Sequence, residues 1–227
     1  MRRLLPSVAA GVVTLCLTAP AHAASVAGSG ISPTTNAGFV MTPPDVRSVS
    51  AYWTVPTVSC NTPDASVRFG VELADADSGT HLSLGVDVDC RAGIPSYVAS
   101  LTAGKGRARL QKVSAGDEMS ASLKAGSTGV DGSFVDYTAG WSDGLLIDYV
   151  IAPTQAGVLV SRRFGASGLR PLADFGSFVV SSSRVDGHTL MQPIERLQMR
   201  PPGDGGPEVR VSNLHRPAGA FTAAWIY

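Results

Sequence analysis

The chain has 227 residues, of which 44% are hydrophobic and 16% are charged. This length fits one domain or two small ones, and the apolar content excludes an intrinsically disordered chain. The 18 basic and 18 acidic residues give a formal net charge of zero, which provides no electrostatic reason to expect a nucleic-acid partner. The 25 glycines and 15 prolines predict many turns and argue against a helical bundle.

Residues 1–23 have the pattern of a secretory signal peptide. A basic start is followed by an apolar run over residues 8–18 and by the cleavage-site pattern Ala21-His22-Ala23. This run is shorter than the roughly 18 apolar residues that a membrane helix needs, and no later segment reaches that length. We therefore expect a secreted, extracellular protein with no membrane span after signal cleavage; the alternative is an uncleaved membrane anchor.

Export determines how the cysteines are interpreted. Cys16 would leave with the signal peptide, so Cys60 and Cys90 remain in an oxidising compartment, where a disulfide is the default state. Two cysteines without histidine partners are too few for a structural zinc site. We expect one disulfide and no metal.

Residues 24–45 are small, polar and rich in Pro and Gly, which predicts a loosely ordered N-terminal lead-in with at most a short strand at 37–41. From residue 46 the chain shows short segments of period-two alternation, most clearly at 48–55. Further strands are predicted at 67–73, 82–88, 119–123, 144–152, 157–160, 175–181, 209–211 and 220–226.

Turn signals separate these segments, and no long segment keeps a helical period. The signals lie at 77–79, 115–117, 130–132, 186–187 and 201–207. Many short strands with frequent turns predict an all-β domain over 46–227, an antiparallel sandwich or barrel.

Candidate chemical groups are few. Three histidines, His81, His188 and His215, could in principle belong to a serine-type triad, but scattered surface histidines are the ordinary interpretation. Asp75 and Asp77 form part of a calcium-loop pattern that lacks the third ligand and the distal glutamate, so a plain acidic turn is favoured.

Two strand pairs are open to more than one interpretation. Asp87 and Asp89 lie on the same side of a predicted strand, where they could share a proton or form a solvated edge. Tyr52 and Trp53 could line a sugar site, but at alternating positions one of them belongs in the core. These features alone support only a secreted all-β domain.

Five segments in fixed order resemble the glutamic peptidases, or eqolisins, particularly their bacterial members. They are residues 49–56, ending in T-V-P; Phe69-Gly70-Val71-Glu72, similar to W-V-G-I-D; residues 84–90, similar to a Q-x-G-x-D strand ending in cysteine; the A-G-D turn at 115–117; and residues 171–176, similar to P-[FL]-A-[DN]-F-G. The resemblance covers about 37–227. It implies a β-sandwich of two curved antiparallel sheets, lectin-like (concanavalin-like) in shape, and an acid-active endopeptidase without metal or cofactor.

The resemblance also implies a catalytic Gln and Glu in one groove, and the sequence departs at both positions. The Gln position falls on Ser83 and the Glu position on Gly157. Serine has about half the reach of glutamine, and glycine has no proton to transfer. Glu72 and Asp87 are the possible substitutes.

The groove residues implied by the resemblance differ as well. The tryptophan of W-V-G-I-D falls on Arg68, and the aromatic-rich strand falls on residues 97–103, where Tyr97 and Ala99 are retained. The scaffold motifs are therefore kept, whereas the groove chemistry is lost.

Three functional hypotheses follow. The first is a catalytically inactive glutamic-peptidase-like protein, a monomer with a binding or envelope-associated role and an unidentified polypeptide or glycan ligand. The second is an acid-active endopeptidase that uses Glu72 and Asp87, and the third is a carbohydrate-binding sandwich. Arg162 and Arg163, beside the lost Glu position, could favour an anionic ligand or form a solvated loop.

Overall fold

The computed structural model describes residues 31–32, 34–104, 106–165, 168–190, 194–200 and 208–226. These residues form strands β1 to β17 and no helix, and none of them belongs to a helix that could cross a membrane. The predicted signal peptide, Cys16 and the turn signal at 201–207 lie outside the described residues.

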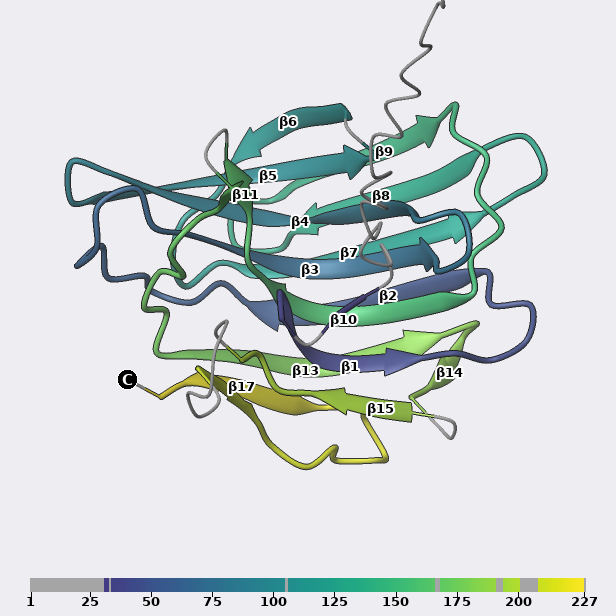
Figure 1. The fold of residues 1–227 in the computed structure, drawn as a ribbon. Helices are drawn as coiled ribbons and strands as arrows, with labels where there is room; N and C mark the ends of the chain where they lie inside the picture. The colour runs from purple at the N-terminus through teal and green to yellow at the C-terminus, as the bar shows by residue number, and fades with distance from the viewer. Residues whose placement is uncertain are drawn as a thin grey trace, which may run out of the picture.

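The strands form two antiparallel sheets packed face to face (Figure 1). The seven-stranded sheet has the order β15-β1-β10-β3-β4-β5-β6, and the eight-stranded sheet has the order β16-β17-β13-β2-β7-β8-β9, with β14 paired to β13. This arrangement is the predicted antiparallel β-sandwich.

The first sheet consists of β15 (Ile194–Leu197), β1 (Asn36–Met41), β10 (Gln155–Ser161), β3 (Ser66–Asp75), β4 (Thr80–Arg91), β5 (Ile94–Ala103) and β6 (Gly106–Lys112). The second consists of β16 (Val209–Val211), β17 (Phe221–Trp225), β13 (Ser177–Val185), β14 (His188–Thr189), β2 (Ser48–Thr54), β7 (Glu118–Ala125), β8 (Val130–Asp136) and β9 (Trp141–Ile147). A short hairpin, β11 (Phe164–Gly165) and β12 (Gly168–Leu169), stands in front of the first sheet (Figure 1).

The core lies between the sheets and follows from the period-two patterns. Alternate residues of each strand point inward, and Trp53 packs edge-on against Phe134 and Phe178. Its neighbour Tyr52 is 47% exposed, so only Trp53 belongs to the core, as the alternation predicted.

The N-terminal strand is a full part of the sandwich. The short strand expected at 37–41 is β1, which is buried throughout and pairs with β10 and β15. The lead-in therefore does not extend to residue 45, because the sandwich begins ten residues earlier than expected. Its first strand was obscured by the many small residues around it.

Three sequence expectations about strands were wrong or incomplete. Residues 130–132 begin β8 and are not a turn: Val130 is buried in the core while Asp131 points outward, and the turn precedes them, closed by a hydrogen bond from Gly126 N to Gly129 O. The strand expected at 144–152 is β9, which ends at Ile147. The alternation did not predict β6, whose residues are mostly exposed.

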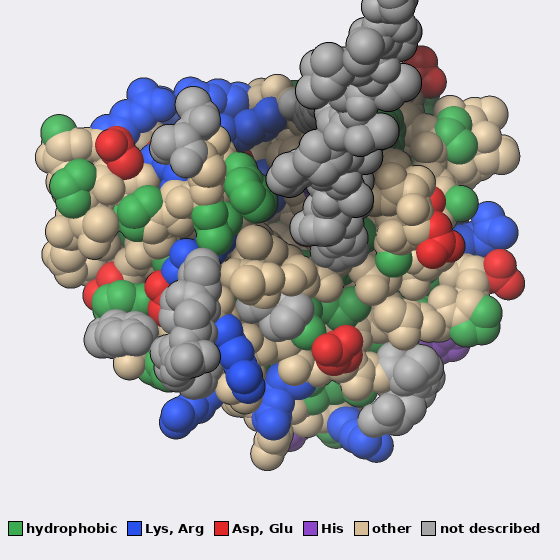
Figure 2. Space-filling view, in the orientation of Figure 1, with side chains coloured by type: hydrophobic (Ala, Val, Ile, Leu, Met, Phe, Trp, Pro, Cys, Tyr) green, Lys and Arg blue, Asp and Glu red, His purple; other side chains and the backbone are tan. Residues whose placement is uncertain are grey.

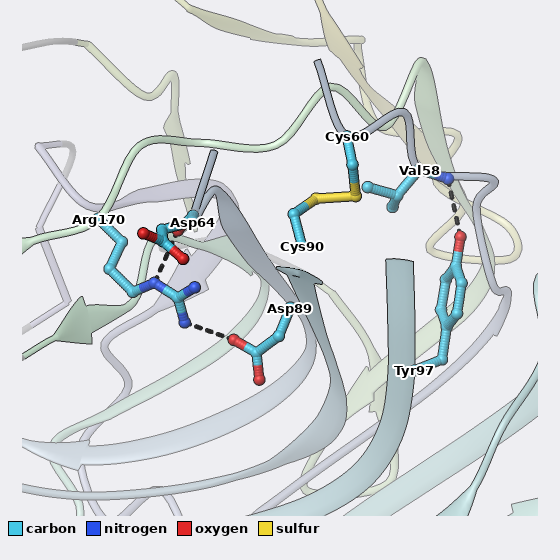
Figure 3. The surroundings of a disulfide bond; sticks show 7 residues. All are labelled: Val58, Cys60, Asp64, Asp89, Cys90, Tyr97 and Arg170. Carbon is cyan, nitrogen blue, oxygen red and sulfur yellow. Dashed lines mark hydrogen bonds and ion pairs between the residues drawn. A yellow bond between two sulfur atoms is a disulfide. The ribbon is translucent and has the colours of Figure 1, made fainter. Parts of the chain in front are cut away.

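The predicted disulfide is present. Cys60 and Cys90 are bonded, with their Cα atoms 5.4 Å apart, and the bond joins the loop after β2 to the end of β4 (Figure 3). In the same region Val58 N donates a hydrogen bond of 2.8 Å to the Tyr97 hydroxyl. The loop before β3 is thus attached to the sheet at two points.

We expect replacement of both cysteines by serine to lower the free energy of unfolding by roughly 3–4 kcal/mol, because the bond closes a loop with a sequence separation of 30. Guanidinium denaturation of wild type and Cys60→Ser/Cys90→Ser checks this. Wild type measured with reductant should approach the variant; equal midpoints for oxidised wild type and variant would contradict the prediction.

Candidate functional site

The outer face of the first sheet, opposite the core, carries the positions singled out by the sequence. Ser83 on β4 lies directly opposite Glu72 on β3, and Glu72 lies directly opposite Gly157 on β10. Directly opposed residues of antiparallel strands point to the same side. The predicted Gln and Glu positions and the candidate substitute Glu72 therefore form one row across three strands.

Next to this row, β3 and β4 carry no side chains on this face. Gly70 and Gly85 lie directly opposite each other, and a Cβ at Gly85 would meet Phe69 O at 2.1 Å. A Cβ at Gly70 would meet Leu84 O at 2.3 Å, so neither position admits a larger residue without a backbone shift. Bare backbone thus separates the Ser83–Glu72–Gly157 row from the charged residues beyond it.

Glu72 is the ionisable group of the row. It keeps part of its surface accessible, but its carboxyl lies deep among neighbouring groups, and burial raises its pKa to about 7 although Arg68 acts to lower it. A carboxyl with this pKa can give and take a proton near neutral pH.

Two further polar residues lie in the adjacent row and were not singled out as a pair by the sequence. Ala74 on β3 is opposite both His81 on β4 and Gln155 on β10. The side chains of His81 and Gln155 therefore project from the same outer face as that of Glu72. Burial lowers the pKa of His81. Only the register of three strands brings these residues together.

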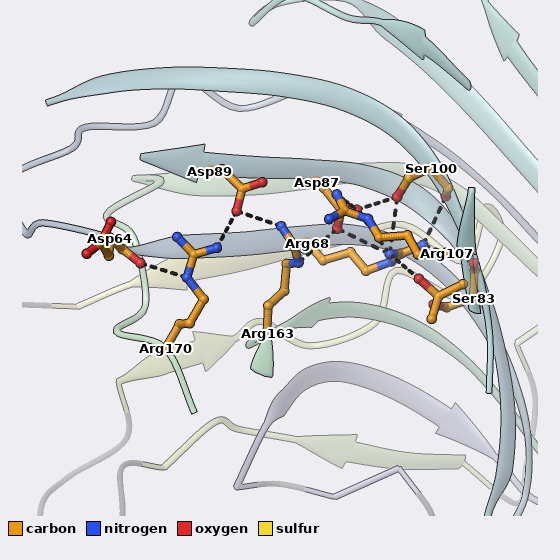
Figure 4. A network of polar contacts seen from close by, with 10 residues as sticks. Asp64, Arg68, Ser83, Asp87, Asp89, Ser100, Arg107, Arg163 and Arg170 are labelled. Atoms are coloured by element: carbon orange, nitrogen blue, oxygen red, sulfur yellow. Dashed lines mark hydrogen bonds and ion pairs between the residues drawn. The ribbon is translucent and has the colours of Figure 1, made fainter. Parts of the chain in front are cut away.

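Arg68 occupies the other side of the bare backbone. Its side chain is 9% exposed and forms an ion pair with Asp87, with an Nη1 to Oδ1 distance of 3.2 Å. It also donates to Thr102 Oγ1 at 2.9 Å and to the carbonyl oxygens of Ser83 and Ser100, each at 2.9 Å (Figure 4). A tryptophan was implied here by the resemblance, and a fixed cation stands in its place.

Three more arginines complete an Arg–Asp cluster, which consists of Arg68, Arg107, Arg163, Arg170, Asp87 and Asp89 (Figure 4). Arg107 from β6 contacts Asp87 at 2.5 Å, and Arg163 contacts Asp87 at 3.5 Å and Asp89 at 2.7 Å. Arg170 contacts Asp89 at 2.5 Å. The cluster therefore joins the β11–β12 hairpin to the sheet.

The expectation that Asp87 and Asp89 form a solvated edge is wrong. Asp87 is 1% and Asp89 8% exposed, because the arginines cover them. Burial alone would raise the pKa of Asp87, but Arg68, Arg163, the Ser100 hydroxyl and Arg107 lower it overall. Asp87 is thus held as a carboxylate to a lower pH than an ordinary aspartate.

The edge strand β6 extends the positive charge. Arg107 is opposite Thr102, Arg109 is opposite Ser100 and Lys112 is opposite Val98. The three basic side chains therefore project from the outer face. In Figure 2 Lys and Arg side chains gather along the edge formed by β6.

A small apolar cluster lies on the opposite half of the outer face and is covered by the chain itself. Val40, Leu159 and Leu197 form a small cluster against which Ile31 packs. Ile31 N donates a hydrogen bond of 3.0 Å to Gln155 Oε1, and Ile31 Cδ1 lies 3.2 Å from where a Cβ of Gly157 would be. Ile31 therefore lies over the position predicted for the catalytic Glu.

Two predicted groove residues lie on the other side of the sheet. Ala99 is fully buried in the core, and Tyr97 packs against the core and accepts its hydrogen bond from Val58 N. The groove assignment of both is therefore wrong, because they alternate with the outward-facing residues of β5, Ser100 and Thr102.

The remaining candidates are accounted for structurally. Asp75 accepts hydrogen bonds from Asp77 N at 3.0 Å and Ser78 Oγ at 2.5 Å, as in an ordinary acidic turn. Among the described residues no group of three or more His, Cys, Asp or Glu could hold a metal ion. Arg162 pairs with Glu208, so neither residue of the Arg162-Arg163 pair lies in a solvated loop.

A separate hollow of about 720 Å³ lies between loops 42–47, 125–127 and 150–155. Its lining includes Pro43, Pro44 and Ile151 and none of the Arg–Asp cluster. We assign no chemistry to it.

The comparisons with known proteins identify the family. A model described as the Peptidase A4 family matches residues 34–193, and the chain belongs to this family, the glutamic peptidases predicted from the five motifs. No curated protein sequence matches the chain.

Solved structures agree with the fold. Scytalido-glutamic peptidase with a transition state analog inhibitor has a TM-score of 0.72 at 17% identity, over 85% of this chain and 98% of that chain. SCP-B, an eqolisin in complex with the tripeptide Ala-Ile-His, has a TM-score of 0.68 at 17% identity over the same shares. Aspergilloglutamic peptidase from Aspergillus niger has a TM-score of 0.60 at 19% identity, over 72% of this chain and all of that chain. The predicted sandwich fold is confirmed.

The raised pKa of Glu72 makes stability depend on pH. In the folded protein the Glu72 carboxyl keeps its proton up to about pH 7, whereas in the unfolded chain it loses the proton near pH 4.5. The stability of the fold therefore falls as the pH rises between these values. Glu72→Gln should be more stable than wild type at pH 8, by about 1–3 kcal/mol, and nearly equal at pH 4. Urea denaturation at both pH values checks this, with the exposed Glu118→Gln as control. A Glu72→Gln variant that is less stable than wild type by the same amount at pH 4 and pH 8 would refute the prediction.

Asp87→Asn should remove about 3 kcal/mol of stability at pH 7, because it leaves the buried Arg68 without its counter-charge. Since the folded-state pKa of Asp87 is lowered, its contribution is present above about pH 4 and is lost as the pH falls through the folded pKa. The variant should therefore lose less stability than wild type on acidification. Asp131→Asn, exposed on β8, serves as the matched control; equal stability of the two variants at pH 7 would contradict the account.

Proposed function

We propose that this protein is a secreted, catalytically inactive member of the glutamic peptidases that binds a ligand on the outer face of its seven-stranded sheet. The observation that carries the proposal is the Ser83–Glu72–Gly157 row. The two family positions stand in one row and hold a serine and a glycine, neither of which supplies general acid–base catalysis by the family's mechanism.

Asp87 does not replace the missing carboxyl. Its oxygens contact Arg68, Arg107 and Arg163, and their charges keep it ionised. A carboxylate fixed in this way is a poor proton donor and is not free to move toward a substrate. The hypothesis of two relocated carboxylates therefore reduces to Glu72 alone.

One specific observation favours a second candidate, a hydrolase with relocated groups. Glu72 has a pKa of about 7, and Gln155 leaves the same face one row away, so a glutamate and a glutamine again lie on neighbouring strands. Side chains in this diagonal relation are roughly 7–8 Å apart at Cα, within reach of a shared substrate. Glu72→Gln abolishes any activity of this kind.

A carbohydrate-binding role has less support. The described strands β1, β3, β4, β5, β6 and β10 present no Phe, Tyr or Trp side chain on the outer face on which a sugar ring could stack. Polar and charged side chains dominate there instead.

We expect purified protein from residue 24 to 227 to leave a denatured protein substrate intact at pH 2–5, at a rate at least about 10⁴-fold below an active glutamic peptidase. Mass spectrometry of the substrate checks this. Cleavage by wild type that disappears in Glu72→Gln would establish the second candidate, and cleavage that survives Glu72→Gln would overturn both.

The double variant Ser83→Gln/Gly157→Glu tests whether the row is the former catalytic site. The atoms nearest to a Cβ at Gly157 belong to the side chains of Leu159 and Ile31, at 3.0–3.2 Å, and these side chains can shift. Measurable acid cleavage by this variant, absent in either single variant, would support the assignment. A folded but inactive variant that binds no transition state analog would count against it.

A further inference from the structure

The charged half of the outer face has more cations than anions. The Arg–Asp cluster contains four guanidinium groups and two carboxylates, and Arg109 and Lys112 add two more cations from β6. The whole chain is neutral, so this excess is a local feature of the face. A concentrated field of one sign attracts ligands of the other sign.

The Arg–Asp cluster also contains guanidinium N–H donors that its own carboxylates do not use. Arg107 contacts Asp87 through Nη2 only, while Arg170 donates through Nε to Asp64 O and through Nη1 to Asp89. Within the described part of the chain Nε and Nη1 of Arg107 and Nη2 of Arg170 have no partner, and the two side chains are 26% and 21% exposed. Guanidinium groups with free, solvent-reaching N–H groups suit carboxylates, which they bind in a bidentate manner.

The position of these cations favours a polypeptide. Strand β6 is the last strand of its sheet and has no neighbour on its outer side among the described strands, so its free N–H and C=O groups match an added peptide strand. Arg107 and Arg109 are two residues apart on that strand, a separation of roughly 6.8 Å, which equals the spacing of alternate side chains in an extended peptide.

We propose that this face binds an acidic polypeptide segment in extended form, whose alternate Asp or Glu side chains pair with Arg107, Arg109 and the free donors of the Arg–Asp cluster. The proposal rests on the proposed function, binding without cleavage, and adds the class of ligand. Lys and Arg on an edge strand also protect it from pairing with other copies, but that role requires neither an acidic ligand nor the spare donors beside it.

The test is fluorescence anisotropy with a labelled ten-residue peptide of alternating Glu and Ser, compared with the same peptide carrying Gln in place of Glu. We expect saturable binding of the Glu peptide that weakens with salt and at least tenfold weaker binding of the Gln peptide. Arg107→Gln/Arg109→Gln should weaken binding of the Glu peptide about tenfold, because it removes two charged pairs.

The matched control is Arg210→Gln/Arg216→Gln, which removes the same charge from exposed positions in and after β16 and should bind like wild type. Circular dichroism of both double variants verifies their folding. No binding of the Glu peptide, equal weakening by both double variants, or binding of an oligogalacturonate in preference to the peptide would each overturn the proposal. Mass spectrometry of the peptide after incubation reports separately on the proposed function, because cleavage would refute that function whether or not the peptide binds.

Discussion

The ion pair between Arg68 and Asp87 is the interaction on which the outer face depends. Both side chains are buried on the face opposite the hydrophobic core, where an unpaired charge would carry a large desolvation penalty. Asp87 balances Arg68 and Arg163 through Oδ1 and draws Arg107 toward the sheet through Oδ2. The edge strand and the β11–β12 hairpin are therefore held by the same carboxylate.

The glycines opposite each other on β3 and β4 have a complementary role. Gly70 and Gly85 allow the two backbones to approach closely, and they leave a strip without side chains between the charged cluster and Glu72. The strip divides the face into an ionised half and a half in which burial keeps Glu72 protonated up to about pH 7. Two opposite electrostatic environments thus exist on one sheet.

Much of the fold could be predicted from the sequence, because the inward residues of β2, β3 and β4 alternate strictly and the five motifs fall on strands and turns. The arrangement of the candidate site was harder to predict from the sequence. Nothing in the local sequence of Asp87 shows that Arg163, 76 positions later in the chain, covers it. For this reason Asp87 was interpreted as solvated. Ala99 was placed in the groove by the resemblance alone, although the alternation of its strand points it into the core.

Arg68 also bears on the proposed loss of catalysis. A general acid must hold a proton until the leaving group needs it, and a nearby guanidinium stabilises the ionised form instead. Arg68 already acts to lower the pKa of Glu72 across the bare backbone strip, although burial outweighs it there. Where the resemblance implies an apolar tryptophan, Arg68 places a cation, which in the proposed function disfavours an acid catalyst and attracts an anionic ligand. In the proposed function, the change that suits this face to binding carboxylates is also one that disfavours an acid catalyst beside it.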